Sequence, residues 1–102
     1  MRNIYFTLTG TKYYYGPDIL QPGMKITLRR EPDNEYDTEA ICVTLKGLGT
    51  IGHVANSPYT VLGESMSAGR IYDKIGHKAT AHVLTITPRG TLCILGSKSI
   101  KH

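Results

Sequence analysis

The segment from residue 10 to residue 16, Gly-Thr-Lys-Tyr-Tyr-Tyr-Gly, places one cation beside three consecutive tyrosines. A tyrosine ring offers a nucleic-acid base a flat surface for stacking, a contact that contributes roughly 1–3 kcal/mol. Lys12 could then meet the adjoining phosphate. Consecutive side chains of a strand or loop point in different directions, so at most two of the three rings serve one surface. The competing interpretation is a tyrosine-rich strand edge that packs against the protein's own core.

A second segment, residues 31–41, carries five acidic side chains at alternate positions, and its residues 32–34 are Pro-Asp-Asn, which favour turns. A carboxylate in such a loop accepts a hydrogen bond from a sugar hydroxyl but repels a phosphate. That combination favours a chain end with a free hydroxyl over a continuous backbone. Two other interpretations stay open. One is a calcium loop, although the glycine at its sixth position and the flanking helices are missing, and the other is a solvated acidic turn.

A third segment, residues 51–57, contains His53 directly after Gly52, and a glycine inside a strand lets another group approach the backbone closely. A single histidine of this kind is more often structural than a ligand or a base. It shares no metal-ligand spacing with the other histidines. Cys42 and Cys93 each lie in an apolar run without a CxxC pattern, which is typical of buried thiols. We therefore predict no metal site and no cofactor.

The charge is distributed unevenly along the chain, whose formal net charge is +4. Five of the eight acidic residues fall between residues 31 and 39. The remainder of the chain has twelve Lys and Arg against three acidic residues, which favours a polyanion over an acidic or neutral partner. The start of the chain is polar and contains no long apolar run, so we expect a cytoplasmic protein without a membrane span.

The elements that must hold these segments are mostly strands. Apolar and polar residues alternate with a period of two in several runs, as in a half-buried strand, and turn residues separate them. Pro88-Arg89-Gly90 and Gly47-Leu48-Gly49 are hairpin turns. The expected strands cover residues 3–9, 24–30, 40–45, 50–54, 79–87 and 91–95.

A helix-compatible segment lies between residues 57 and 75, where Ser57-Pro58 could begin one turn. Gly63 and Gly69 weigh against one continuous helix. About six strands with one short helical segment in roughly one hundred residues predict a mainly β fold, a small OB-like barrel. We assign residues 1–96 to a single domain and residues 97–102 to a frayed polar tail.

The three segments, in this order and spacing, resemble the HIRAN domain. Residues 31–41, Glu-Pro-Asp-Asn-Glu-Tyr-Asp-Thr-Glu-Ala-Ile, followed by Ile-Gly-His-Val at 51–54, are similar to that family's most specific pattern. The likeness extends over roughly residues 5–95. Residues 56–61 and 67–75 resemble the short, free-standing bacterial members, which are related to the N-terminal domain of the helicase-like transcription factor.

The resemblance implies a modified OB-like barrel that binds single-stranded DNA at its 3′ end. Asp37 would then accept the proton of the terminal hydroxyl. Tyr13 and Tyr36 would stack on or flank the last bases, while Tyr14 and Lys12 would hold the backbone phosphate. With His53 lining the same pocket, the implied nucleic-acid-binding residues are Lys12, Tyr13, Tyr14, Asn34, Tyr36, Asp37, His53 and Asn56.

The sequence departs from the eukaryotic pattern at two positions. Lys12 stands in place of an arginine, so a bidentate phosphate clamp becomes a point charge. Asn56 stands in place of a lysine that would contact another phosphate. These changes imply weaker affinity, or an end specificity that has not been carried over.

Two classes of function remain. The first is a non-enzymatic module for single-stranded or end-bearing DNA in a repair or replication context, working beside a separate helicase or nuclease chain. The second is a protein-interaction or structural domain on the same fold without DNA affinity. No P-loop, RING finger or nuclease carboxylate cluster is present, and an Asp33, Asp37 and His53 metal site has little support.

Overall fold

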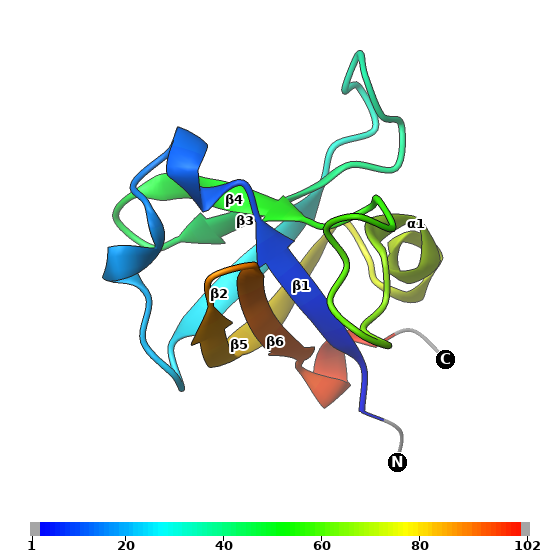
Figure 1. The fold of residues 1–102 in the computed structure, drawn as a ribbon. Coiled ribbons are helices and arrows are strands. Elements are labelled where there is room, and N and C mark those ends of the chain that lie inside the picture. Colours follow the sequence, from blue (N-terminus) through cyan, green and yellow to red (C-terminus); the bar gives the residue numbers. More distant parts are fainter. Residues whose placement is uncertain (1–2, 101–102) are drawn as a thin grey trace.

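The computed structural model describes residues 3–100, which form a closed barrel of six antiparallel strands in the order β1-β4-β3-β2-β5-β6. Figure 1 shows β1 between β4 and β6, which it joins to close the barrel. The predicted mainly β, OB-like barrel is therefore confirmed, with strand ends shifted by one or two residues. The strands are β1 (Tyr5–Thr9), β2 (Lys25–Arg30), β3 (Ile41–Leu45), β4 (Gly49–Val54), β5 (Lys78–Thr87) and β6 (Gly90–Leu95).

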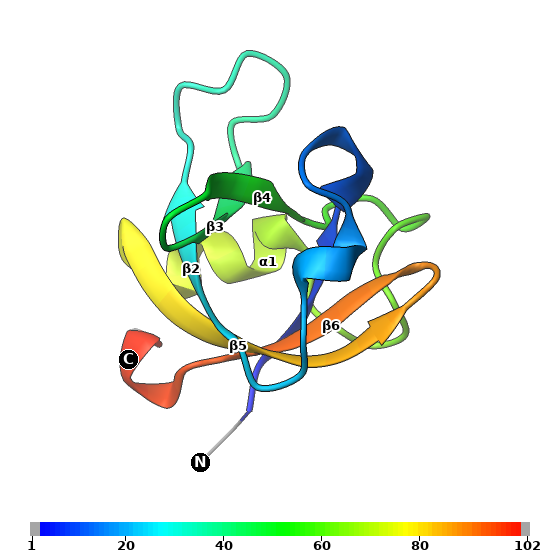
Figure 2. The same ribbon diagram turned by 90° about the vertical axis from the view of Figure 1, so that its left-hand side faces the viewer.

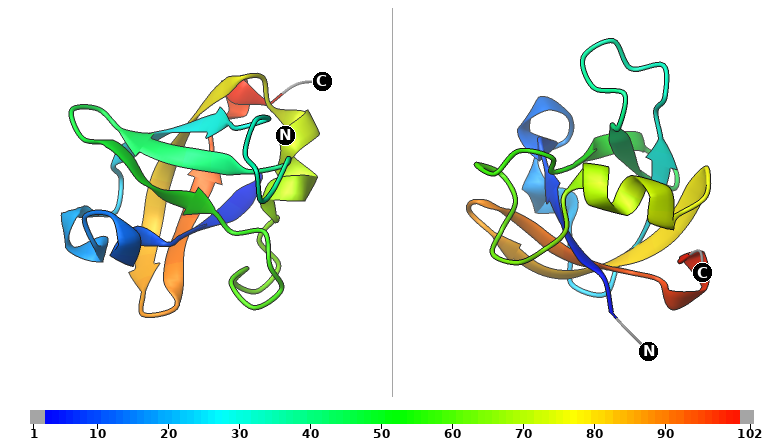
Figure 3. Two further views of the ribbon diagram at one scale, coloured as in Figure 1. Left: turned by 90° about the horizontal axis from the view of Figure 1, so that it is seen from above. Right: turned by 90° about the vertical axis from the view of Figure 1, so that its right-hand side faces the viewer.

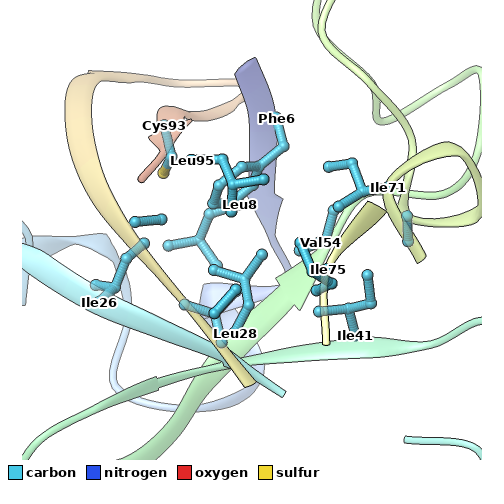
Figure 4. Close-up of a cluster of buried hydrophobic side chains, with 14 of the residues drawn as sticks. Phe6, Leu8, Ile26, Leu28, Ile41, Val54, Ile71, Ile75, Cys93 and Leu95 are labelled. Carbon is cyan, nitrogen blue, oxygen red and sulfur yellow. The ribbon is translucent and has the colours of Figure 1, made fainter. Parts of the chain in front are cut away.

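The period-two pattern places alternate apolar side chains inside the barrel. On β1, Phe6 and Leu8 point into the core, and on β2, Ile26 and Leu28 do so. Figure 4 shows these side chains meeting those of the opposite strands around one centre. Burial of this apolar surface, at roughly 25 cal/mol per Å², is the main force that holds the barrel. Both predicted hairpins are present, since β3 pairs with β4 and β5 pairs with β6.

The helical segment is shorter than its sequence range allows. The α-helix α1 is Ala68–Ile71, and Ser67 caps it by accepting a hydrogen bond from the Arg70 amide. Ser57 begins one turn, as predicted, because the Val61 amide donates to its carbonyl at 3.0 Å, but no helix follows. The right-hand view of Figure 3 shows α1 lying across one end of the barrel. Within residues 3–100, no helix has the length and apolar character needed to cross a membrane.

The loop between β4 and α1 covers the outer side of β1. Thr7 is fully buried, and its hydroxyl lies 2.8 Å from the Ser65 hydroxyl and accepts a hydrogen bond from the Leu62 amide. The Ser65 hydroxyl in turn donates to the Leu62 carbonyl. These bonds satisfy polar groups that would otherwise be costly to bury. They fasten residues 57–66 to β1 and cover the outer face of this strand at Thr7.

Residues 97–100, assigned to a polar tail from the sequence, contact the barrel in the structure. Ser97–Ser99 form a 3-10 turn, and the Ser99 hydroxyl accepts a hydrogen bond from the Thr80 amide at 2.9 Å. Ile100 forms a bridge with Ile75 and packs against the core. The packing of Ile100 against the core holds residues 97–100 on the barrel. The last two residues of the predicted tail, 101 and 102, lie outside the described part.

Gly52 permits the close approach of β1 and β4 that the sequence predicted. A Cβ atom at this position would lie 2.7 Å from Leu8 Cδ1 and 2.7 Å from the Thr9 carbonyl oxygen. We therefore expect Gly52→Ala to lower the free energy of unfolding by about 1–3 kcal/mol, as overpacked cores do. Gly76→Ala is the matched control, since a Cβ there meets no atom within 4 Å. Urea unfolding of both variants checks this, and equal stabilities would contradict it.

Cys93 makes stability depend on pH in the alkaline range. Burial raises the pKa of its thiol from 9.0 to about 12. Because the unfolded thiol ionises first, the unfolded state binds fewer protons above pH 9, and stability falls as the pH rises toward 12. Below about pH 9, the pKa of the unfolded thiol, the thiol is protonated in both states and stability does not change with its ionisation. We expect urea unfolding between about pH 8 and pH 10 to give a shallower decline in Cys93→Ala than in the wild type. Parallel declines would contradict the prediction.

Candidate nucleic-acid interface

Two loops that carry predicted binding residues project from the same side of the barrel. The first, residues 10–16, follows β1 and contains the 3-10 turn Thr11–Tyr13. The second, residues 31–40, joins β2 to β3. Figure 2 shows both loops rising above the barrel with the β3–β4 hairpin beneath and between them. The topology therefore brings the tyrosine-rich and the acidic segments to one surface.

His53, on β4, contacts both loops. Its Nε2 atom lies 3.0 Å from Glu31 Oε1, at the start of the second loop. Its ring centre lies 6.0 Å from that of Tyr14, in the first loop, within the range of an aromatic contact. Both His53 and Glu31 are about one-third exposed, so the pair lies at the surface and can face a ligand. His53 thus lies between the two loops.

Asn34 organises the second loop from within. Its Oδ1 atom accepts hydrogen bonds from the amides of Tyr36 and Asp37, at 2.9 and 3.0 Å. Asp37 continues the pattern, because its Oδ1 atom accepts from the Glu39 amide at 2.9 Å. Such side-chain to backbone bonds are the means by which Asn and Asp stabilise turns. The side-chain oxygen of Asn34 is therefore occupied by hydrogen bonds within the loop.

Asn56 ties this loop to the helical segment. Its Nδ2 atom donates to Asp37 Oδ2 at 2.9 Å, and its Oδ1 atom accepts from the Gly69 amide at 2.8 Å. Gly69 lies so close to the loop that a Cβ atom there would be 2.8 Å from Glu39 Oε1. Asn56 therefore lies beside Asp37, and both ends of its amide are used inside the protein.

The tyrosines of both loops are exposed to different extents. Tyr15 is 51% exposed, and its hydroxyl donates to the Leu48 carbonyl in the turn between β3 and β4. Tyr13 is 75% exposed and carries the Lys12 ammonium 5.1 Å from its ring centre. Tyr36 is 94% exposed at the tip of the second loop. Tyr13 and Tyr36 are therefore the most exposed rings of the two loops.

Two further residues line hollows beside predicted site residues and were not among the predicted site residues. Arg70 lines a hollow of about 660 Å³ with Asn56. Arg89 lines a second hollow, of about 420 Å³, with Lys12 and Tyr13. Arg89 could have been found from the sequence because it lies in a predicted turn. Nothing in the local sequence places Arg70 next to Asn56.

The acidic residues do not gather into a metal site. Asp37 is bonded to Asn56, while His53 is bonded to Glu31, so the two face different partners. In the part of the chain from residue 3 to residue 100, no group of three His, Cys, Asp or Glu side chains could hold a metal ion. What the arrangement offers is a fixed carboxylate, exposed aromatic rings and single cations, which are the parts of a binding surface.

The fold and these loops define a small OB-like barrel that presents a binding surface. A model of the HIRAN domain matches residues 1–77. The crystal structure of a protein from Lactobacillus plantarum has a TM-score of 0.62 at 22% identity, covering 92% of this chain and 93% of that chain. The crystal structure of the HIRAN domain of human HLTF has a TM-score of 0.59 at 17% identity, covering 91% of this chain and 74% of that chain. No curated protein was found to match.

The chain belongs to the HIRAN domain family. This confirms the resemblance found in residues 31–41 and 51–54. HIRAN domains generally bind DNA, and they are binding domains rather than catalytic ones. The roles of individual residues in this chain remain predictions.

The Asn56 bridge gives a prediction about the order of the second loop. Asn56→Ala removes the hydrogen bonds to Asp37 and to the Gly69 amide, so residues 31–40 lose their attachment to the helical segment. We expect amide hydrogen exchange in this loop to accelerate several-fold, with a loss of global stability of about 1 kcal/mol. Ser57→Ala is the neighbouring control, since Ser57 bonds only within its own turn. Equal exchange in both variants would argue against the bridge.

Proposed function

We propose that this chain binds single-stranded DNA at a free 3′ end, through the surface between residues 10–16 and residues 31–40. The observation that carries the proposal is the Asp37 carboxylate, held in place by two hydrogen bonds and directly preceded by the exposed Tyr36. Membership of a family that generally binds DNA supports the choice of ligand. The setting we propose is DNA repair or replication, beside a separate helicase or nuclease chain.

Asp37 is suited to a terminal hydroxyl. Each of its oxygens accepts one hydrogen bond within the protein, from the Glu39 amide and from Asn56. An ionised carboxylate has about four acceptor sites, so each oxygen keeps capacity for a further donor. A 3′ hydroxyl donates to it, whereas a phosphate at the same place brings a second negative charge and is repelled. The carboxylate therefore discriminates between the two kinds of end.

The rings and the cation supply the rest of the contact. A base stacked on Tyr36 or on Tyr13 contributes roughly 1–3 kcal/mol without dependence on sequence. Lys12 lies close enough to the Tyr13 ring to reach a phosphate beside a base stacked there. Because Asn56 is engaged inside the protein, it adds no phosphate contact. We therefore expect binding that is salt-sensitive but modest in strength.

The test is fluorescence anisotropy with single-stranded DNA labelled at its 5′ end and ending in either a 3′ hydroxyl or a 3′ phosphate. The wild type should prefer the hydroxyl by roughly tenfold or more, the worth of one hydrogen bond to a charged group. Asp37→Asn should abolish this preference. Asp33→Asn is the matched control, because it removes the same charge from the same loop at an exposed position.

The salt dependence separates this proposal from a protein-interaction domain. Three or four phosphate contacts on a single strand give a slope of about −2 to −3 in a log-log plot of affinity against salt. Equal binding to both ends would retain single-strand binding and remove end recognition. Absence of binding at low salt would overturn the proposed function in favour of a protein partner.

A further inference from the structure

A second charged surface lies outside this interface, on the outer face of β2, β3 and β5. It is a shallow groove of about 670 Å³, and we call it the basic groove. Four of its lining residues are cations and none is acidic. In the left-hand view of Figure 3, the β3–β4 hairpin that borders it extends away from α1. The lining residues are Lys25, Thr27, Arg29, Thr44, Leu45, Lys46, Gly47, Gly49 and Lys78.

The strand register sets like charges against each other in this groove. Arg29 on β2 lies directly opposite Lys78 on β5. Like charges at directly opposed positions destabilise a sheet. Among residues 3–100 no carboxylate lies within 4.0 Å of any of the four cations, since the one such ion pair there joins His53 and Glu31. The sheet itself gains nothing from this arrangement, whereas a bound polyanion would turn the repulsion into attraction.

The floor of the groove indicates which polyanion fits. Thr27 and Thr44 face each other across β2 and β3, so hydroxyls and glycines lie between the cations. No aromatic ring lines the groove, and a single strand relies on such rings for stacking. A duplex keeps its bases inside and presents only its phosphates and sugars. Hydroxyls and cations without aromatic rings therefore match the backbone of a duplex.

The spacing of the cations is compatible with this ligand. Lys25 and Arg29 are four residues apart on one strand, which is about 13 Å. The major groove of B-DNA is about 12 Å wide, so two cations at this separation can reach phosphates on its two edges. Arg29 also lines a hollow with Glu31 and Asn34, so the groove adjoins the loop of residues 31–40.

We propose that the basic groove binds the phosphate backbone of duplex DNA. The groove shares no residue with the proposed end site, so the inference goes beyond that site and can fail or succeed separately. Together, the two surfaces would hold the junction between a duplex and a single-stranded 3′ end. The duplex would lie over β2 and β5, with the free end between the two loops.

The test uses a short, covalently closed dumbbell duplex, which has no chain end for the other site to recognise. Lys25→Gln combined with Lys78→Gln removes two groove cations. We expect this double variant to bind the dumbbell about tenfold more weakly, with a log-log salt slope less steep by about 2. The control, Lys74→Gln combined with Lys98→Gln, removes the same charge outside the groove and should retain wild-type binding.

Two further measurements separate an effect on the basic groove from an effect on folding or on the end site. Thermal unfolding should show the Lys25 and Lys78 double variant to be at least as stable as the wild type, because the repulsion of Arg29 is relieved. Its preference for a 3′ hydroxyl over a 3′ phosphate should persist, whereas Asp37→Asn should lose that preference and still bind the dumbbell. This pattern separates failure of the groove from failure of the end site.

The proposal is overturned if the wild type does not bind the dumbbell at low salt, or if the control double variant loses as much affinity as the groove variant. A polyglutamate peptide serves as the competing probe. Groove-dependent binding of this peptide, without binding of the dumbbell, would assign the surface to an acidic protein instead.

Discussion

Closure of the barrel between β1 and β4 is the constraint on which the rest of the structure depends. The two strands pair only at their ends, through Leu8 with Val54 and Thr9 with His53. The short contact requires a residue without a Cβ atom at position 52. The same pairing brings His53 beside the loop that leaves β1. The pairing that closes the barrel therefore also places His53 at the candidate interface.

The barrel was largely predictable because its determinants are local. Alternating apolar residues define the strands, and Gly and Pro define the hairpins, whatever the distant contacts. The end of the described chain depends on a distant contact instead. Ile100 orders the last described residues because Ile75 is there to pair with it.

The candidate site, like the barrel, has some features that the local sequence predicts and others that depend on distant contacts. The residue types in the two loops pointed to stacking and to a carboxylate that accepts a hydroxyl, and the fold brings them to one surface. What the sequence could not reveal is which polar atoms already have partners. Asn56 occupies a position where a phosphate contact was expected, yet its amide joins Asp37 to Gly69. The basic groove was equally hidden, since residues 25, 29, 46 and 78 come together only through strand register.

The covered, closed barrel has a consequence for assembly. Each of the six strands has a hydrogen-bonded neighbour on both sides, and the loop fastened by Thr7 and Ser65 shields β1 from outside. A protein that docks by adding a strand to a sheet edge needs an unpaired row of backbone groups. A closed barrel has no free edge strand, and its pairing is incomplete only over short stretches, as between β1 and β4. A protein partner of this domain is therefore expected to contact its side chains and loops rather than to extend its sheet.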